Sequence, residues 1–328
     1  MLPLIYHPIY SQLELPKGHR YPIMKYHYLY QAVVEKLATK GWGEQIEFFQ
    51  PNPLSVDDIK RVHSGEYVDL LVTGSMPAVK MRRIGFPWSE ALIARTLTST
   101  AGTVLTAEMA LEHGVAIHLS GGYHHAHKDF GSGFCLFNDL AIAAKHMLDH
   151  DHIDKVMIID SDVHHGDGTA TLCEEEPDII TLSFHCDKNF PARKPDSDLD
   201  VPLSRDTSDE TFLMTFKEVV EMAINLHRPD MVIYDAGVDI HTDDELGYFD
   251  VSTEGIFERD RFLMQLMKDK GIPVAAVVGG GYRSDHADLV PIHMQLIEAV
   301  AQVYVFEQFE GLADKKVKGI RMSVRSYW

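Results

Sequence analysis

The sequence contains few cysteines, no long apolar run and far fewer basic than acidic side chains. Its three cysteines, Cys135, Cys173 and Cys186, are far apart, and no Cys-x-x-Cys pair occurs. This pattern excludes a disulfide framework and favours a reducing cytoplasm. No apolar run approaches the ~20 residues that cross a bilayer, and the first residues lack the basic and apolar regions of a signal peptide. We therefore expect a cytoplasmic protein that does not enter a membrane.

The charge of the chain bears on its partners. Lys plus Arg number 30 and Asp plus Glu number 49, which gives a formal net charge of −19. Nucleic-acid binding needs a basic surface that displaces counterions, so we expect no nucleic-acid partner. A negative surface is compatible with a cationic substrate, although many acidic proteins are simply soluble. The 328 residues show no linker, repeat or low-complexity stretch, which favours one domain over residues 1–328.

Apolar runs and helical patterns alternate along the chain. Such alternation predicts a parallel sheet with helices on both faces, an α/β class of fold. Residues 1–25 are rich in proline, which indicates an irregular arm. We also expect a long loop over residues 185–202 and a basic tail over residues 315–325. The predicted strands are 46–49, 115–119, 156–160, 179–184, 231–234 and 273–278. The predicted helices are 26–40 (ended by Gly41), 55–62, 66–73, 90–112, 138–149, 169–175, 209–226, 253–270 and the regular segment 286–306.

Unusual polar residues gather in four loops, each directly after a predicted strand: 120–134, 160–168, 235–247 and 279–285. In a parallel sheet the carboxyl ends of the strands share one edge, where open α/β proteins bind their ligands. The four loops should therefore meet.

The loop at 160–168 carries the first candidate site. Asp160, Asp162 and His164 alternate at the end of an apolar strand, so their side chains point the same way. A polar strand end that reaches solvent is one explanation; a divalent metal that compensates the buried charges is the other. With Asp239, the residues Asp162 and His164 make three protein ligands and leave one position for water, the pattern of a catalytic zinc site.

The other loops carry groups that can move protons. His124 and His125 can take and return a proton near neutral pH, and Asp160 and Asp167 can orient those imidazoles. Tyr282 follows three glycines and can donate a hydrogen bond to an oxyanion. Taken singly, the histidine pair could be surface or core decoration, Asp239 a helix cap and the glycines a tight turn. Together in one place, they favour chemistry.

The sequence resembles the zinc-dependent histone deacetylase family. Overall, it is more similar to the bacterial and class IV members of that family than to the class I members. The resemblance runs from about residue 1 to 306 and rests on five motifs in the family's order. These are Gly-Gly-Tyr-His-His-Ala (121–126), Gly-Ser-Gly-Phe-Cys-Leu-Phe-Asn-Asp (131–139), Asp-Ser-Asp-Val-His-His-Gly-Asp-Gly (160–168), Ala-Gly-Val-Asp (236–239) and Gly-Gly-Gly-Tyr (279–282). The chain departs from the family's usual pattern at Tyr123, beside the histidine pair.

The resemblance implies the arginase/deacetylase fold, a three-layer α/β/α domain with a mostly eight-stranded parallel sheet, and hydrolysis of an amide on an acylated amine. Carried over by position, the zinc ligands are Asp162, His164 and Asp239, and Tyr282 is the oxyanion donor. His125, paired with Asp167, is the principal base and acid; His124, paired with Asp160, is its electrostatic partner. Gly133, Phe134 and Phe190 line the acyl tunnel. A structural monovalent cation, usually potassium, is implied at Asp160, at the backbone of Asp162 and His164, and near Ser183 and Phe184.

Leu246 bears on the substrate. Seven residues after the third zinc ligand, acetylpolyamine deacetylases of this type place a glutamate that can select a distal ammonium, whereas this chain has a leucine. The expected substrate is therefore an acyl-lysine peptide or protein, which need not be a histone. Three alternatives stay open: a deacetylase of acetylpolyamines or similar small amines, a silent binder of acyl-lysine, and an arginase-like hydrolase, which would need more carboxylates.

Overall fold

One parallel sheet forms the centre of the molecule. The computed structural model describes residues 1–40 and 45–306. In these residues eight strands run in the order β2-β1-β3-β8-β7-β4-β5-β6, and each neighbouring pair is parallel. The strands are β1 (Leu2–Ile5), β2 (Ile46–Phe49), β3 (Val115–His118), β4 (Val156–Asp160), β5 (Ile179–Cys186), β6 (Leu199–Leu203), β7 (Met231–Asp235) and β8 (Val274–Val277). This confirms the eight-stranded parallel sheet that the resemblance implies.

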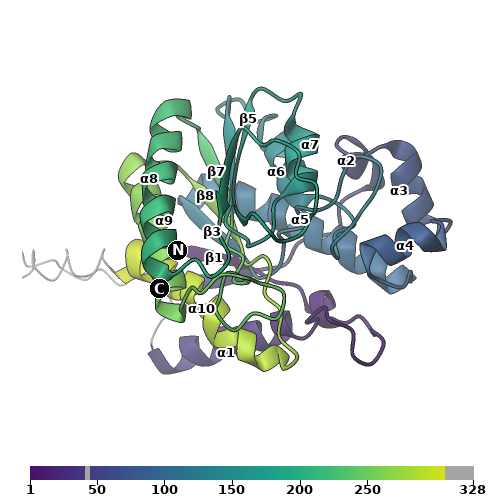
Figure 1. Ribbon diagram of the computed structural model, residues 1–328, viewed down its shortest axis with the longest axis horizontal. Helices are drawn as coiled ribbons and strands as arrows, with labels where there is room; N and C mark the ends of the chain where they lie inside the picture. Colours follow the sequence, from purple (N-terminus) through teal and green to yellow (C-terminus); the bar gives the residue numbers. More distant parts are fainter. Residues whose placement is uncertain (41–44, 307–328) are drawn as a thin grey trace, which may run out of the picture.

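Helices cover both faces of the sheet and make three layers (Figure 1). One face is covered by α5 (Glu90–His113), α6 (Asp139–Met147) and α7 (Asp167–Cys173), and the other by α1 (Lys25–Lys40), α8 (Asp209–His227), α9 (Thr253–Lys270) and α10 (Val290–Val300). The short helices α2 (Val56–Lys60), α3 (Gly65–Val72) and α4 (Ala78–Ile84) form a lobe beyond α5. Among the described residues, no helix combines the length and the apolar character that a membrane span requires.

The core follows from the apolar runs. Every residue of β3, β4, β7 and β8 is buried, as expected for parallel strands covered on both faces. Local signals set the helix ends. Ser89 accepts a hydrogen bond from the Leu92 amide at the start of α5, and Gly114 ends that helix with a φ of 83°. Asn138 caps α6 through the Ala141 amide.

Two strands and one helix differ from the sequence prediction. Residues 1–25, predicted as an irregular arm, contain β1, and the predicted loop 185–202 ends in β6. Both strands include a proline, which is unfavourable inside a strand and therefore argued against a strand in the sequence. Proline is tolerated in β6 because this strand forms the edge of the sheet. The helix α4 was not predicted. Gly41 and the basic segment 315–325 lie outside the described residues.

The sheet order explains where the polar loops meet. The strands β3, β8, β7, β4 and β5 are consecutive in the sheet. The loops that leave their carboxyl ends are those with the unusual polar residues, together with the loop after β5. Five loops therefore converge on one edge.

Candidate active site

Asp162, His164 and Asp239 form one buried cluster. Asp162 and His164 follow β4, and Asp239 follows the neighbouring strand β7. His164 Nδ1 lies 2.9 Å from Asp162 Oδ1 and 3.1 Å from Asp239 Oδ2. The Val163 amide donates to Asp239 Oδ1 at 2.8 Å and so fixes the position of that carboxylate. The three ligand atoms lie within 4.8 Å of one another.

The charges and the shape of this cluster fit a divalent metal ion. Burial raises the pKa of Asp239 to about 6, and the nearby Asp162 adds to the rise. Burial opposes a charge on His164, yet Asp162 and Asp239 raise its pKa to about 10. The cluster therefore attracts positive charge. Gly280 leaves the room for it, because a Cβ there would collide with a carboxylate oxygen of both Asp162 and Asp239. Two oxygens and one nitrogen are a donor set that zinc accepts.

Two histidine–aspartate pairs lie beside the cluster. His124 Nδ1 lies 2.6 Å from Asp160 Oδ2, and His125 Nδ1 lies 2.6 Å from Asp167 Oδ1. The two Nε2 atoms are 3.1 Å apart. Both pairings are those that the resemblance implies.

The two imidazoles differ in charge. Burial lowers the pKa of His125 to about 3, and the charge of His124 adds to this effect. Burial acts in the same direction on His124, but Asp160 and Asp162 outweigh it and hold its pKa well above the ordinary value. The surroundings thus favour the neutral form of His125 and the protonated form of His124. This difference suits one proton acceptor and one electrostatic partner.

Tyr282 lies on the loop after β8, half-buried, with its ring centroid 6.3 Å from that of His164. Burial raises its pKa well above the ordinary value, and Asp162 and Asp239 add to the rise. The phenol therefore keeps its proton and can donate a hydrogen bond. Asp244 fixes this loop by accepting from the Tyr282 amide at 2.6 Å.

A cavity of about 1120 Å³ opens onto these groups. His125, His164, Asp167 and Tyr282 reach its wall, and so do the predicted tunnel residues Gly133, Phe134, Phe190 and Leu246. The Phe190 ring meets the His125 ring edge-on, with centroids 4.8 Å apart. Gly133 has to be small, because a Cβ there would lie 2.5 Å from His125 Cδ2. The aromatic part of the wall suits an aliphatic chain.

The predicted monovalent-cation residues come from β4, the loop after it, and the neighbouring strand β5. Asp160 of β4 is in register with Ser183 of β5. The Ser183 hydroxyl lies 3.1 Å from His185 Nδ1. The Phe184 side chain packs in the core against Phe216, so only its backbone could face an ion. Asp160 also forms a possible ligand group with His124 and Asp235, and both carboxylate oxygens of Asp235 are buried with no hydrogen-bond partner among the described residues.

Several supporting residues escaped the sequence reasoning. Lys25 donates to the Gly279 carbonyl at 2.9 Å, and Asp139 accepts from the Tyr123 amide at 2.7 Å. His127 shares Asp167 with His125, at 3.0 Å. The Tyr123 hydroxyl contacts the Ser99 hydroxyl at 2.6 Å in the core. The departure from the family pattern at Tyr123 thus adds a buried contact behind the histidine pair.

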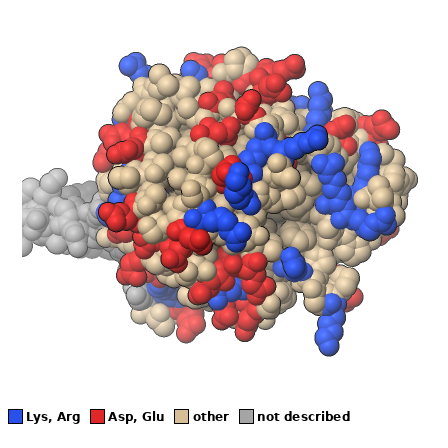
Figure 2. Space-filling model, viewed as in Figure 1, with Lys and Arg blue, Asp and Glu red and all other residues tan. Residues whose placement is uncertain are grey.

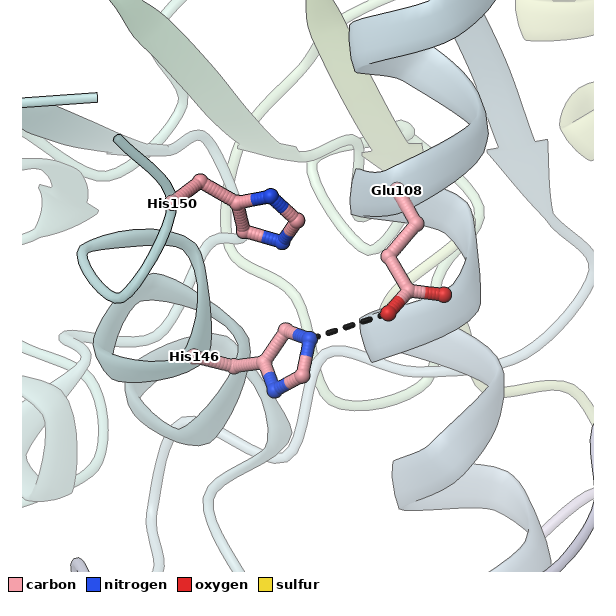
Figure 3. Close-up of side chains that lie close together, drawn as sticks. All are labelled: Glu108, His146 and His150. Atoms are coloured by element: carbon pink, nitrogen blue, oxygen red, sulfur yellow. Dashed lines mark hydrogen bonds and ion pairs between the residues drawn. The ribbon is translucent and has the colours of Figure 1, made fainter. Parts of the chain in front are cut away.

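Two other groups of possible ligands do not contribute to the cavity wall. Glu108 Oε1 on α5 lies 3.0 Å from His146 Nε2 on α6, and the ring of His150 is turned towards the same space (Figure 3). His165 Nε2 lies 3.0 Å from Asp200 Oδ1, beside His185.

The sequence was also compared with known protein families and with individual proteins. The sequence model of the histone deacetylase domain matches residues 24–295, which include the ligand cluster, the histidine pair and Tyr282. The chain is 39% identical over 302 residues to an uncharacterized protein of Picosynechococcus sp., covering 92% of this chain and 99% of that protein. It is 30% identical over 270 residues to Histone deacetylase 2 of Arabidopsis thaliana, covering 79% of this chain and 69% of that protein. It is 33% identical over 261 residues to Histone deacetylase 3 of Oryza sativa subsp. japonica, covering 73% of this chain and 50% of that protein. The chain thus spans from half to about two thirds of these plant relatives.

Proposed function

This chain belongs to the histone deacetylase family, and from that premise we propose that it is a zinc-dependent amidohydrolase that removes acetyl or longer acyl groups from lysine side chains. The proposed substrates are acyl-lysine peptides or proteins, and the catalytic domain is proposed to span residues 1–328. The observation that carries the proposal is the convergence of a three-ligand cluster, two histidine–aspartate pairs and a protonated tyrosine on one aromatic cavity.

Asp162, His164 and Asp239 would hold the zinc, whose chemistry is to polarise an acyl carbonyl and to lower the pKa of water. A structural potassium ion would bind at Asp160, at the backbone of Asp162 and His164, and near Ser183 and Phe184. The three cysteines of the chain are free thiols, which supports action in a reducing cytoplasm.

The side chains around the cavity divide the proton transfers between them. His125, neutral at pH 7, accepts a proton from the attacking water, and Asp167 at 2.6 Å from Nδ1 stabilises the imidazolium that forms. His124 carries a fixed positive charge that favours negative charge developing on the substrate. Tyr282 donates its phenolic hydrogen to the oxygen of the tetrahedral species. His125 then returns its proton to the leaving lysine amine, so that free lysine and a carboxylate are the products.

One feature supports the small-amine alternative. Glu245, next to Leu246, also lies on the cavity wall and could attract a distal ammonium. Its Oε1 is engaged by the Ser284 amide at 2.6 Å, which holds the carboxylate at the rim. Because the residue seven positions after Asp239 is Leu246 and not a glutamate, we nevertheless rank acylated polyamines below acyl-lysine peptides.

The test is a substrate panel on zinc-loaded, untagged protein. The panel contains peptides with acetyl-lysine, longer acyl-lysine and trifluoroacetyl-lysine, and acetylpolyamines alongside. We expect release of free lysine peptide, seen by mass spectrometry, at a higher kcat/KM than release of any polyamine. His125→Asn should lose this activity while it still binds zinc. If no acyl-lysine peptide is hydrolysed, or if His125→Asn is as active as the wild type, the proposal is wrong.

A further inference from the structure

The cavity that holds the acyl-lysine site has a basic rim, although the chain as a whole is strongly acidic. Four cationic residues line the cavity: Arg20, Arg83, Arg193 and Lys194. They come from three separate segments, namely the N-terminal arm, the end of α4 and the loop after β5. On the face drawn in Figure 2, several Lys and Arg side chains lie at and to the right of the centre, while Asp and Glu side chains are spread over the top, the left and the lower part. The residues that line the cavity therefore differ in charge balance from the whole chain, whose formal net charge is −19.

The three arginines are available to a ligand. In the described part of the structure, no carboxylate oxygen lies within 4.0 Å of the guanidinium groups of Arg20, Arg83 or Arg193. All three side chains are exposed. The Arg83 guanidinium is held 3.8 Å above the ring centroid of Phe130, which itself lines the cavity. The mouth thus carries three arginines that form no ion pair within the described residues, beside one rim carboxylate, Glu245, and this excess of positive charge favours an anionic ligand.

Lys194 has a different role. Its Nζ donates to the carbonyl oxygens of Asp187, Asn189 and Pro191 at 3.1, 2.9 and 2.8 Å. It therefore braces the loop that carries Arg193 and Phe190. Partial burial lowers its pKa below the ordinary value.

The two acidic residues that line the cavity, Asp167 and Glu245, are fewer than its four cationic residues and are engaged by protein groups. Asp167 is engaged by His125 and His127. Glu245 accepts a hydrogen bond from the Ser284 amide; hydrogen bonds from Ser284 lower the pKa of Glu245 below the ordinary value, and the charges of Arg283 and Arg20 add to this effect. Phe134 and Phe190 make an aromatic part of the cavity wall, which offers no ion-pair partner to a charged side chain of a substrate. A charged side chain of a substrate would therefore be bound at the rim.

We propose that the mouth selects acyl-lysine residues flanked by acidic side chains, with Arg20, Arg83 and Arg193 as the specificity residues. This inference rests on the proposed function and names its substrate class. The planar guanidinium matches a carboxylate in two parallel hydrogen bonds. The overall negative charge opposes this selection only weakly, because charges farther away than about 8–10 Å are screened at physiological salt.

The experiment compares three acetyl-lysine peptides of equal length, whose residues on either side of the lysine are Glu, Gln or Lys. In the zinc-loaded wild type, kcat/KM should fall in the order Glu, Gln, Lys, through KM rather than kcat, and the differences should shrink as salt is raised. Arg20→Gln, Arg83→Gln and Arg193→Gln should each reduce the preference for the Glu peptide by roughly two- to fivefold, the range of exposed ion pairs. The triple variant should lose the preference. Arg82→Gln is the matched control, because Arg82 is an exposed neighbour of Arg83 that does not line the cavity.

The outcomes separate this inference from the proposed function. Hydrolysis of the Gln peptide without any preference for Glu, or a preference that survives in the triple variant, would overturn the acidic-substrate inference and leave the deacylase function intact. If none of the peptides is hydrolysed, the proposed function fails. The binding affinities of the same peptides, measured by fluorescence anisotropy, then decide the inference: an order of Glu, Gln, Lys that depends on the arginines supports it, and equal affinities overturn it.

Discussion

Lys25 and Gly279 are joined by a hydrogen bond of 2.9 Å from Nζ to the carbonyl oxygen, although 254 residues separate them in the sequence. Lys25 is buried, and its Nζ lies 5.9 Å from the ring centroid of Tyr282. It therefore ties the start of α1 to the loop that carries the proposed oxyanion donor.

Removal of this tie should loosen that loop. We expect Lys25→Met to lower the free energy of unfolding by about 1–3 kcal/mol, since it leaves a buried carbonyl without a partner. It should also lower kcat more than it changes KM, because Tyr282 loses its fixed position. Urea denaturation and steady-state kinetics measure the two effects, and Lys17→Met, at an exposed position, is the control. A variant with wild-type kcat would show that Lys25 does not position Tyr282.

Tyr282→Phe removes the phenolic donor and keeps the ring. Turnover should fall by roughly 10²–10³, the scale of one lost oxyanion donor, while the affinity for a non-hydrolysable substrate analogue changes less. Single-turnover kinetics together with a binding titration separate the two quantities. Unchanged turnover would reduce Tyr282 to a packing residue.

Stability should depend on pH through His63, which is buried between two loops. Its Nδ1 donates to the His127 carbonyl at 2.8 Å, and its Nε2 accepts from the Asn138 amide at 2.9 Å. Burial lowers its pKa from 6.5 to about 4. The unfolded chain therefore binds a proton more readily than the folded chain between these values, and His63 stabilises the fold less as the pH falls from 6.5 towards 4.

At 1.36 kcal/mol per pH unit, the interval between 6.5 and about 4 corresponds to about 3 kcal/mol. Urea denaturation of wild type and His63→Gln at several pH values measures this pH-dependent contribution to the free energy of unfolding. The variant should be less stable at pH 7, and the difference between the two proteins should shrink at acid pH. A difference that stays constant with pH would contradict the role of His63.

Leu246 should help to set the substrate class. It lies on the cavity wall, and its carbonyl accepts from Asn189 Nδ2 at 2.9 Å, which joins the loops after β7 and β5. Leu246→Glu should shift the ratio of kcat/KM towards N8-acetylspermidine and away from an acetyl-lysine peptide, because a carboxylate attracts the distal ammonium. If the wild type already favours the polyamine, or if the ratio does not move, Leu246 is not the selecting residue.

The sequence revealed those parts of the molecule whose signals are local. The apolar runs of β3, β4 and β7 were visible, and so were the polar residues directly after them. β1 and β6 were missed because Pro3 and Pro202 contradict a strand pattern. The shared edge of a parallel sheet then brought the site together without further information.

Supporting residues could not be found in this way. The partner of Lys25 lies 254 residues away, and nothing around Lys25 in the sequence marks it as buried. Asp244 holds the Tyr282 amide across 38 residues. The basic rim was hidden for the same reason, since Arg20, Arg83 and Arg193 meet only in the folded chain.

The most direct test of the central claim measures zinc content and peptide deacylation in the same samples of wild type, Asp162→Ala and Asp239→Ala. Asp196→Ala, at an exposed position, is the control. We predict about one catalytic zinc per wild-type and control chain, with hydrolysis of acetyl-lysine peptide that disappears on chelation and returns with added zinc. Both cluster variants should lose metal and activity together, because each leaves an incomplete ligand set. Full zinc occupancy with normal turnover in either cluster variant, or undiminished hydrolysis by zinc-free wild type, would contradict the account.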